Sequence, residues 1–522
     1  MQPSSPPSRR EFLAAAAAAA QLAMAEDSTD LPSLTLKQAA ERIRSRQVSP
    51  VELTAQCLDR VKTYNPKINA WITVMQEKAM EQAQALTAEQ KAGHLRGPLH
   101  GIPIGIKDSI DVAGVRTTAA SAVYEYRFAN QDAEVVRRLR AAGAVLLGKC
   151  NMHEFDAGAS SAVSYWGPVR NPWNLERISG GPSGGSAAAV AMQNCFAALG
   201  TDTGGGVRLP AAYCGVVGLK PTFGRVSMRG IVPMAWSLDH CGTLARTVED
   251  AAMILQAIAG YDYQDIDSVD RSVPDYTRAF GAPVAQFRLG IAAEFFDHLD
   301  DEIAKAMEEA QAVLNKLTKG SREVGLPSLL HAGVGAEIIA AHENVRGVNG
   351  GVFEPSTTRA FAASADSARA VDYVRGWRDL ELVRRTVDED VFRKQSVDLL
   401  IAPAARHLPP PVEQELIPPA PAGGGRGGGG RGNAPSRPID LESNTRAFNG
   451  YGLPVITVPC GFSKDGLPIG MQIAGPHFAE EQVLALAHAY QQATDWHLRR
   501  PPLTPDAKVP VLSKTAAEQT GS

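Results

Sequence analysis

Residues 179–222 read SGGPSGGSAAAVAMQNCFAALGTDTGGGVRLPAAYCGVVGLKPT, and this stretch decides both the fold and the site. It joins two glycine-rich turns, an Ala-rich helix and a buried strand into one continuous unit. The first turn, 180–185, leads directly into the helix predicted over 186–192. A turn at a helix N-terminus offers free backbone N–H groups and the positive end of the helix dipole to an anion.

Nucleotide binding is a rival interpretation of that first turn. A dinucleotide-binding fold needs a strand directly before such a turn, whereas residues 170–177, RNPWNLER, are predicted as a loop. Residues 143–150, GAVLLGKC, nearly spell a phosphate-binding P-loop. However, Cys150 stands where Ser or Thr is needed, and the apolar residues between the glycines predict a strand. The P-loop interpretation therefore fails.

Helix and strand signals alternate on both sides of the opening stretch. Two capping patterns, Thr35 with Gln38 and Ser49-Pro50 with Glu52, predict helix starts. Strands are predicted over 102–106, 144–147, 454–458 and 469–473, and helices over 133–142, 301–317, 368–392 and 483–490. This alternation predicts an α/β layered domain.

Composition excludes several classes of protein. The chain has 522 residues, is 44% apolar and has a net charge of −4, which gives no reason to expect nucleic-acid binding. Its six cysteines form neither a disulfide framework nor a CxxC pair. His153-Glu154 does not continue into HExxH, because position 157 is Ala. We expect no metal and no cofactor.

The N-terminal segment resembles an export signal. Ser8-Arg9-Arg10-Glu11-Phe12-Leu13 matches the twin-arginine pattern, an apolar run follows, and Ala23-Met24-Ala25 offers a cleavage site. Residues 1–25 are therefore predicted as a twin-arginine signal and residues 26–522 as the folded domain, exported to the periplasm or beyond. The apolar run is too short to span a bilayer, and no later segment resembles a membrane helix.

Residues 408–438 form a low-complexity segment, LPPPVEQELIPPAPAGGGRGGGGRGNAPSRP. Proline makes its first half stiff and glycine makes its second half flexible. With two arginines among its glycines, the segment is predicted as a solvated surface loop rather than an RNA-binding one. The middle of the chain, 260–400, carries no chemical motif.

Several motifs resemble the amidase signature family, which hydrolyses amide bonds with two serines and a lysine. They are LHGIPIGIKD at 99–108, GTDTGG at 200–205 with Gly206 after it, CGVVGLKPT at 214–222, SLDH at 237–240 and LPVITVP at 453–459. The resemblance runs over 34–260 and 447–496. It implies one α/β domain, with a twisted, mostly parallel mixed sheet between layers of helices.

The resemblance also assigns roles to individual positions. The attacking serine corresponds to Gly206, the relay serine to Pro182 and the base to Lys107. Backbone amides of Thr203, Gly204, Gly205 and Gly206 would bind the oxyanion, and Ser183, Asp202 and Arg208 would form a supporting polar network. Both reacting hydroxyls are absent, and Gly206 cannot form an acyl-enzyme.

Pro182 stands where the family has a cis peptide bond, and proline is the residue that best tolerates cis geometry. We therefore expect a cis Gly181–Pro182 bond. Lys107 loses its hydroxyl partner, and we expect it to be a cation that binds a carboxylate or another anion near the turn.

Three functions follow from this pattern. The first is an exported protein that binds a small amide or carboxylate, with amide hydrolysis impaired or non-standard. The alternative is an active amidase that uses Lys107 with Thr203, Ser179, Ser183 or a water. The third is a component of an assembly, as in transamidation relatives of the family, against which the predicted export argues. The sequence does not identify the ligand or the oligomeric state.

Overall fold

The structure is a computed structural model, and it describes residues 30–329, 334–345, 352–366, 369–416 and 440–512. The predicted signal at 1–25 and residues 417–438 of the predicted surface loop lie outside these ranges.

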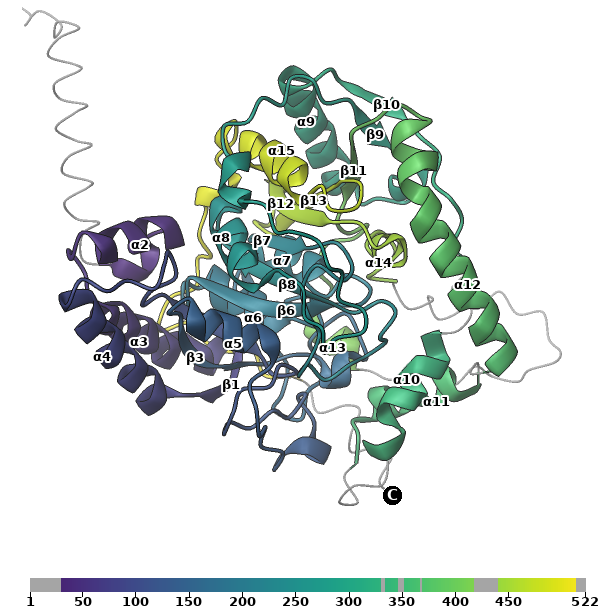
Figure 1. Cartoon of the computed structure of the whole chain (residues 1–522). Helices are drawn as coiled ribbons and strands as arrows, with labels where there is room; N and C mark the ends of the chain where they lie inside the picture. The colour runs from purple at the N-terminus through teal and green to yellow at the C-terminus, as the bar shows by residue number, and fades with distance from the viewer. Residues whose placement is uncertain (1–29, 330–333, 346–351, 367–368, 417–439, 513–522) are drawn as a thin grey trace, which may run out of the picture.

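A mixed sheet forms the centre of the fold (Figure 1). In spatial order its strands are β1 (Trp71–Val74), β3 (Val145–Cys150), β2 (Pro103–Lys107), β6 (Ala197–Asp202), β8 (His240–Ala245), β7 (Val217–Lys220), β12 (Val455–Phe462), β13 (Pro468–Ala474), β11 (Leu399–Pro403), β9 (Leu289–Ile291) and β10 (Ser321–Glu323). Parallel pairs lie on either side of a central antiparallel group. The predicted α/β fold with a mixed sheet is confirmed; of its ten neighbouring strand pairs in the described ranges, four are parallel and six, including β1–β3 at one edge, are antiparallel.

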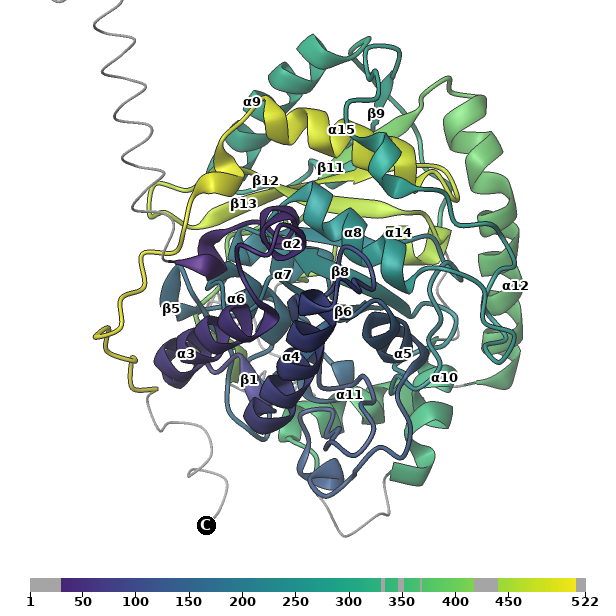
Figure 2. The same cartoon turned by 60° about the vertical axis from the view of Figure 1, so that its left-hand side comes forward.

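Helices cover the sheet in layers (Figures 1 and 2). They are α2 (Leu36–Arg44), α3 (Pro50–Ile68), α4 (Gln76–Lys91), α5 (Glu134–Ala141), α6 (Gly184–Ala191), α7 (Arg208–Cys214), α8 (Val248–Ile258), α9 (Asp301–Leu317), α10 (Val334–His342), α11 (Pro355–Asp366), α12 (Ala370–Val387), α13 (Val412–Leu416), α14 (Arg446–Tyr451) and α15 (Glu480–Gln492). Helices α6 and α7 contact each other and strands β6 and β7, whereas α8 contacts α5, α15 and β8. Among the described residues, most buried apolar side chains form one large core, and smaller clusters lie beside it, including one that contains α10 and α11 residues.

The local signals for helix starts are confirmed. Both capping boxes form: the Thr35 hydroxyl accepts from the Gln38 N–H at 3.1 Å, and the Ser49 hydroxyl accepts from the Glu52 N–H at 3.2 Å. The helix predicted over 301–317 is α9, and the one predicted over 368–392 is α12 followed by a π-helical turn, Asp388–Arg393. No helix in the described ranges is long and apolar enough to cross a membrane.

Two segments predicted as loops contain regular structure. The segment predicted as a loop over 170–177 belongs to an antiparallel hairpin of β4 (Arg170–Asn171) and β5 (Asn174–Ile178). The side-chain amide of Asn171 stabilises it by donating to the Ile178 carbonyl at 3.1 Å and to the Tyr213 carbonyl at 2.8 Å. The first residues of the predicted 408–438 loop contain α13, and the Ile178 N–H bonds to the Pro410 carbonyl. The hairpin is separate from the main sheet, so the first glycine turn still lacks the strand that a dinucleotide site needs.

Candidate functional site

The site lies where two neighbouring parallel strands end. Lys107 is the last residue of β2 and Asp202 is the last residue of β6. Because parallel strands end at the same edge of a sheet, these two side chains and the turn at 203–206 gather there. Helix α7 begins directly after the turn.

The turn offers unpaired backbone donors. Among the described residues, no acceptor takes the N–H groups of Thr203, Gly204, Gly205 or Gly206. The carbonyl of Gly204 is held by the Thr445 hydroxyl. Gly205 has a φ of 143°, and a Cβ there would lie 2.1 Å from Thr445 Oγ1, so only glycine fits. The turn is therefore fixed from outside while its donors stay free, as an oxyanion site requires.

Pro182 and Gly206 face each other beside this turn. The Gly181–Pro182 bond is cis, which confirms the prediction. A Cβ on Gly206 would lie 2.6 Å from Pro182 Cδ and 2.5 Å from the Thr201 carbonyl oxygen. The Pro182 carbonyl accepts from the His153 N–H and from the Ser161 hydroxyl, both at 3.1 Å. The proline ring thus fills the space beside position 206.

Lys107 has two partners that the sequence did not reveal. Its ammonium lies 2.5 Å from Asp156 Oδ1 and donates to the Thr201 hydroxyl, which in turn donates to Asp156 Oδ2 at 2.9 Å. All three side chains are buried. Lys107 therefore has a carboxylate and a hydroxyl of the protein itself as partners, which corrects the expectation that it lacks a hydroxyl partner.

Burial controls the charges around Lys107. Burial lowers the pKa of Lys107, and the carboxylate of Asp156 opposes that shift. Burial also lowers the pKa of His153 to about 3, and the nearby Lys107 ammonium adds to the effect. His153 is therefore neutral at physiological pH, and its single described side-chain neighbour within hydrogen-bond range is the Ser160 hydroxyl, at 3.4 Å.

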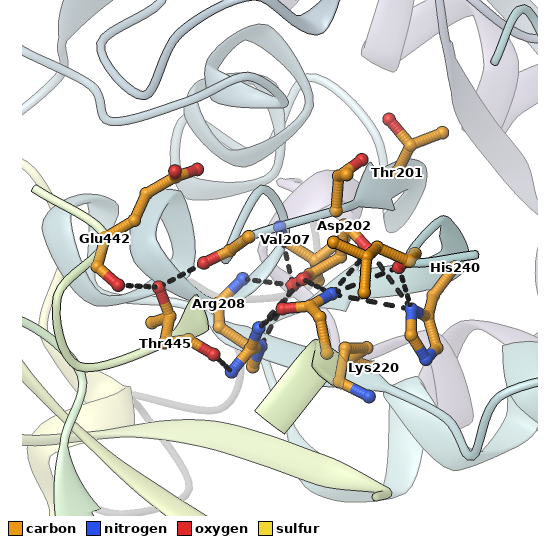
Figure 3. Close-up of polar contacts among 12 residues, drawn as sticks. Thr201, Asp202, Val207, Arg208, Lys220, His240, Glu442 and Thr445 are labelled. Carbon is orange, nitrogen blue, oxygen red and sulfur yellow. Dashed lines mark hydrogen bonds and ion pairs between the residues drawn. The ribbon is translucent and has the colours of Figure 1, made fainter. Parts of the chain in front are cut away.

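The predicted supporting residues Asp202 and Arg208 form a buried ion pair (Figure 3). The Arg208 guanidinium donates to both carboxylate oxygens of Asp202, at 3.0 and 2.9 Å, and also to Asn449, Gln472 and the Thr445 carbonyl. Burial opposes ionisation of Asp202, but Arg208 holds the pKa of that carboxyl below its usual range. Asp202 also accepts the Val207 N–H at 3.1 Å, which ties the network to the start of α7.

Two of the hydroxyls considered as substitute nucleophiles are occupied elsewhere. The Ser183 hydroxyl donates to the Thr201 carbonyl at 3.1 Å, and the Ser183 N–H donates to the Gly206 carbonyl at 3.1 Å. The Ser179 hydroxyl donates to the Gly180 carbonyl at 3.2 Å. Both residues are fully buried. Ser183 holds the first turn against β6, Ser179 bonds within the turn, and neither offers its hydroxyl to a substrate.

Thr203 has a different environment. It is half-buried on the turn, and its hydroxyl donates to Asp239 Oδ1 at 2.6 Å. Asp239 also accepts the N–H groups of Met234 and Ala235. Burial raises the pKa of Asp239 to about 7, although these hydrogen bonds oppose the shift. A hydroxyl paired with a carboxylate that titrates near neutrality is a nucleophile–base arrangement.

Glu442 is a further carboxyl group that sequence reasoning missed. A Cβ on Gly204 would lie 2.8 Å from Glu442 Oε2, so this carboxylate lies over the turn. Burial raises the pKa of Glu442, and Arg446, 3.5 Å away, opposes the shift. Figure 3 shows the Glu442 side chain directed away from the Arg208 network. No group of potential metal ligands occurs in the described part of the chain.

Comparison with known proteins gives consistent matches over most of the chain. The Amidase family model matches residues 52–484. The chain is 40% identical over 498 residues to a glutamyl-tRNA(Gln) amidotransferase subunit from Methylococcus capsulatus, with 90% of this chain and 98% of the relative covered. It is also 40% identical over 495 residues to the corresponding protein from Azotobacter vinelandii, covering 90% and 99%.

Solved structures agree with this comparison. A 6-aminohexanoate cyclic dimer hydrolase superposes with a TM-score of 0.79 at 29% identity, covering 90% of this chain and 99% of that one. A peptide amidase from Stenotrophomonas maltophilia gives a TM-score of 0.76 at 28% identity, covering 90% and 98%.

These relatives contradict the predicted location. Their name assigns them to an enzyme that acts on glutamyl-tRNA, and aminoacyl-tRNA is a cytoplasmic substrate. The expectation of an exported, periplasmic protein is therefore wrong. The twin-arginine pattern was a short match in an Ala-rich segment, whereas the relationship to these amidotransferase proteins extends over nine-tenths of the chain.

The family model covers residues 52–484, which include the strands, the turn and the helices that build the site, and the relatives and superposed structures each cover 90% of the chain. The chain belongs to the amidase signature family.

Proposed function

We propose that the protein hydrolyses carboxylic amides, with Thr203 as the attacking hydroxyl and Asp239 as its base. One observation carries this proposal. The Thr203 hydroxyl donates to Asp239 at 2.6 Å from a turn whose own N–H groups are unpaired among the described residues. Nucleophile, base and oxyanion donors are therefore neighbours, which is the arrangement that acyl transfer needs.

The chemistry follows from these groups. The Thr203 oxygen bonds to the amide carbon while its proton passes to Asp239, and the turn amides hold the carbonyl oxygen as it becomes negative. The C–N bond then breaks, and the amine leaves with the proton from Asp239. Water, deprotonated by Asp239, cleaves the resulting ester, which releases the carboxylic acid and restores the Thr203 hydroxyl.

The environment of Thr203 favours it over the other hydroxyls near the turn. Ser179 and Ser183 are fully buried and bonded to backbone carbonyls. Thr201 is 2% exposed and has Lys107 and Asp156 on either side. Thr203 alone among these four is half-buried rather than buried, so it is the one of the four residues with exposed surface that a substrate can approach.

The relatives support an active enzyme more than a binding protein with impaired hydrolysis. Superposed structures are named as a cyclic dimer hydrolase and a peptide amidase, and the curated relatives as amidotransferase subunits. The loss of serine at positions 182 and 206 therefore points to a changed mechanism on a retained amide site.

A second candidate function is release of ammonia from an amide within a larger enzyme. The observation that favours it is the coverage of 98% of a relative that is named as one subunit of an amidotransferase. The same turn would then release ammonia from a primary amide for transfer. Ammonia release from glutamine, with no hydrolysis of anilides, would favour this candidate over a free-standing amidase.

Purified protein tests the proposal with three probes: glutamine, a C-terminal peptide amide and an acyl p-nitroanilide. Because a general base contributes about 10²–10⁴-fold to rate, Thr203→Val and Asp239→Asn should each lower kcat/KM at least about 100-fold. Thr277→Val is the matched control, since Thr277 donates a similar bond to Asp275 at an exposed site. If Thr203→Val hydrolyses the probes as fast as Thr277→Val, Thr203 is not the nucleophile.

A further inference from the structure

Three consecutive residues, Glu154, Phe155 and Asp156, connect Lys107 to the middle region of the chain. They form a 3₁₀ turn in which Phe155 and Asp156 have φ values of 48° and 60°. Positive φ is rare for a residue as bulky as Phe. The turn therefore has a conformation that its surroundings must hold in place.

Asp156 faces the site from this turn. Its carboxylate lies 2.5 Å from the Lys107 ammonium and accepts the Thr201 hydroxyl at 2.9 Å. Thr201 also touches the other side of the site, since a Cβ on Gly206 would meet its carbonyl oxygen at 2.5 Å. Lysine, threonine and aspartate thus form a closed triangle next to the turn at 203–206.

Phe155 faces the opposite way, into a cap made by α10, α11 and Phe353. Its ring centroid lies 5.3 Å from that of His342, 5.5 Å from that of Phe353 and 6.4 Å from that of Phe361. Glu154 also contacts this region through a hydrogen bond, because its carboxylate accepts the Glu354 N–H at 2.9 Å. The cap therefore contacts both residues that precede Asp156, Glu154 and Phe155.

We propose that Asp156 is a positioning residue that holds Lys107 as a cation beside the 203–206 turn, and that the cap sets the place of Asp156 through Phe155. The catalytic benefit of this arrangement rests on the proposed function. A fixed positive charge next to unpaired N–H groups stabilises the oxyanion that develops during amide hydrolysis. It also gives a role to a region of the sequence that carries no motif.

The charge of Lys107 depends on every ionisable group that faces it. These groups are Asp156 on the 3₁₀ turn, Asp202 at the end of β6, Asp239 before β8, and the neighbours His153 and Cys241. Asp156 is the carboxylate in direct contact. Burial lowers the pKa of Lys107, so removal of Asp156 leaves desolvation much less opposed.

NMR of protein labelled with ¹³C at lysine Cε measures this charge without any substrate, and Lys107→Arg assigns the signal. Wild-type Lys107 should be charged at pH 7. In Asp156→Asn its midpoint should fall by at least about one pH unit, because an opposite charge in contact contributes about 1–3 units. Thr203→Val should lower the midpoint much less than Asp156→Asn does, because Thr203 reaches Lys107 only through Asp239, while it abolishes hydrolysis. Failure of this inference and failure of the proposed function are therefore distinguishable.

Phe353→Leu tests the cap without touching the triangle, and Phe280→Leu, at a ring pair outside the cap, is its control. We expect a fall of the Lys107 midpoint in the first variant and none in the second. A neutral Lys107 in wild type at pH 7 would overturn the proposal, and this measurement needs no variant at Asp156. An unchanged midpoint in folded Asp156→Asn or in folded Phe353→Leu would overturn it as well.

Discussion

The ring of Pro182 lies where a side chain on Gly206 would have to be. A Cβ on Gly206 would be 2.6 Å from Pro182 Cδ and 2.9 Å from Pro182 Cγ, distances that real Cβ atoms do not show. Pro182 and Gly206, the two positions at which the sequence resemblance implies serines, are therefore sterically linked. Proline at one position requires glycine at the other.

Gly206→Ser should consequently destabilise the protein, whatever it does to activity. Overpacking of a buried position costs about 1–3 kcal/mol, and here the contacts include the rigid Thr201 carbonyl as well as the proline ring. Urea denaturation measures the loss. In the double variant Pro182→Ser/Gly206→Ser the cost at position 206 should shrink, because only the carbonyl contact remains. Additive effects of the two substitutions would show that the positions are independent.

The Asp202–Arg208 pair should be required for stability. Arg208→Met leaves the Asp202 carboxylate buried without its partner, and such a change costs about 3–5 kcal/mol. Arg278→Met is the matched control: the Arg278 side chain is 81% exposed and its ion pair with Asp275 spans 3.6 Å. We expect the control to stay within about 0.5 kcal/mol of wild type. Equal unfolding free energies for the two variants would contradict the structural account of the network.

Much of this site was visible in the sequence, and the missing part has a physical explanation. The strand that ends at Lys107 and the capping boxes follow from local patterns, and the cis Gly181–Pro182 bond follows from the family resemblance; all three are confirmed. Asp156 was missed because it is 49 residues from Lys107 and reaches it only through a turn with positive φ. Thr201, in contrast, belongs to the GTDTGG motif at 200–205. Its hydroxyl, two residues before Thr203, could have been predicted from the sequence as a partner of Lys107.

The prediction of an exported protein was wrong because it depended on one short local pattern. A twin-arginine match concerns a few residues in a low-complexity segment, and it carries no information about the domain that follows.

The hairpin at 170–178 was missed because its strands are short and lack the alternation that marks longer ones.

Acid should destabilise the protein partly through His153. Its pKa in the folded protein is about 3, against about 6.5 in the unfolded chain, so the unfolded state binds the proton first as pH falls. The stability that the neutral His153 contributes is present in full above pH 6.5 and is lost progressively between pH 6.5 and pH 3. At pH 5 the loss of unfolding free energy amounts to about 2 kcal/mol. His153→Gln should show a shallower fall in unfolding free energy between pH 7.5 and pH 5. Parallel curves would argue against a buried neutral His153.

The central claim is that Thr203 attacks with Asp239 as its base, and the pH dependence of kcat/KM for the acyl p-nitroanilide tests it most directly. Since the pKa of Asp239 is raised to about 7, its base form is lost as pH falls below 7. The account predicts a wild-type rate that drops about tenfold per unit below that point and an Asp239→Asn variant that is at least about 100-fold slower at pH 8. A flat profile from pH 5 to pH 9, or wild-type rates in Asp239→Asn, would contradict it.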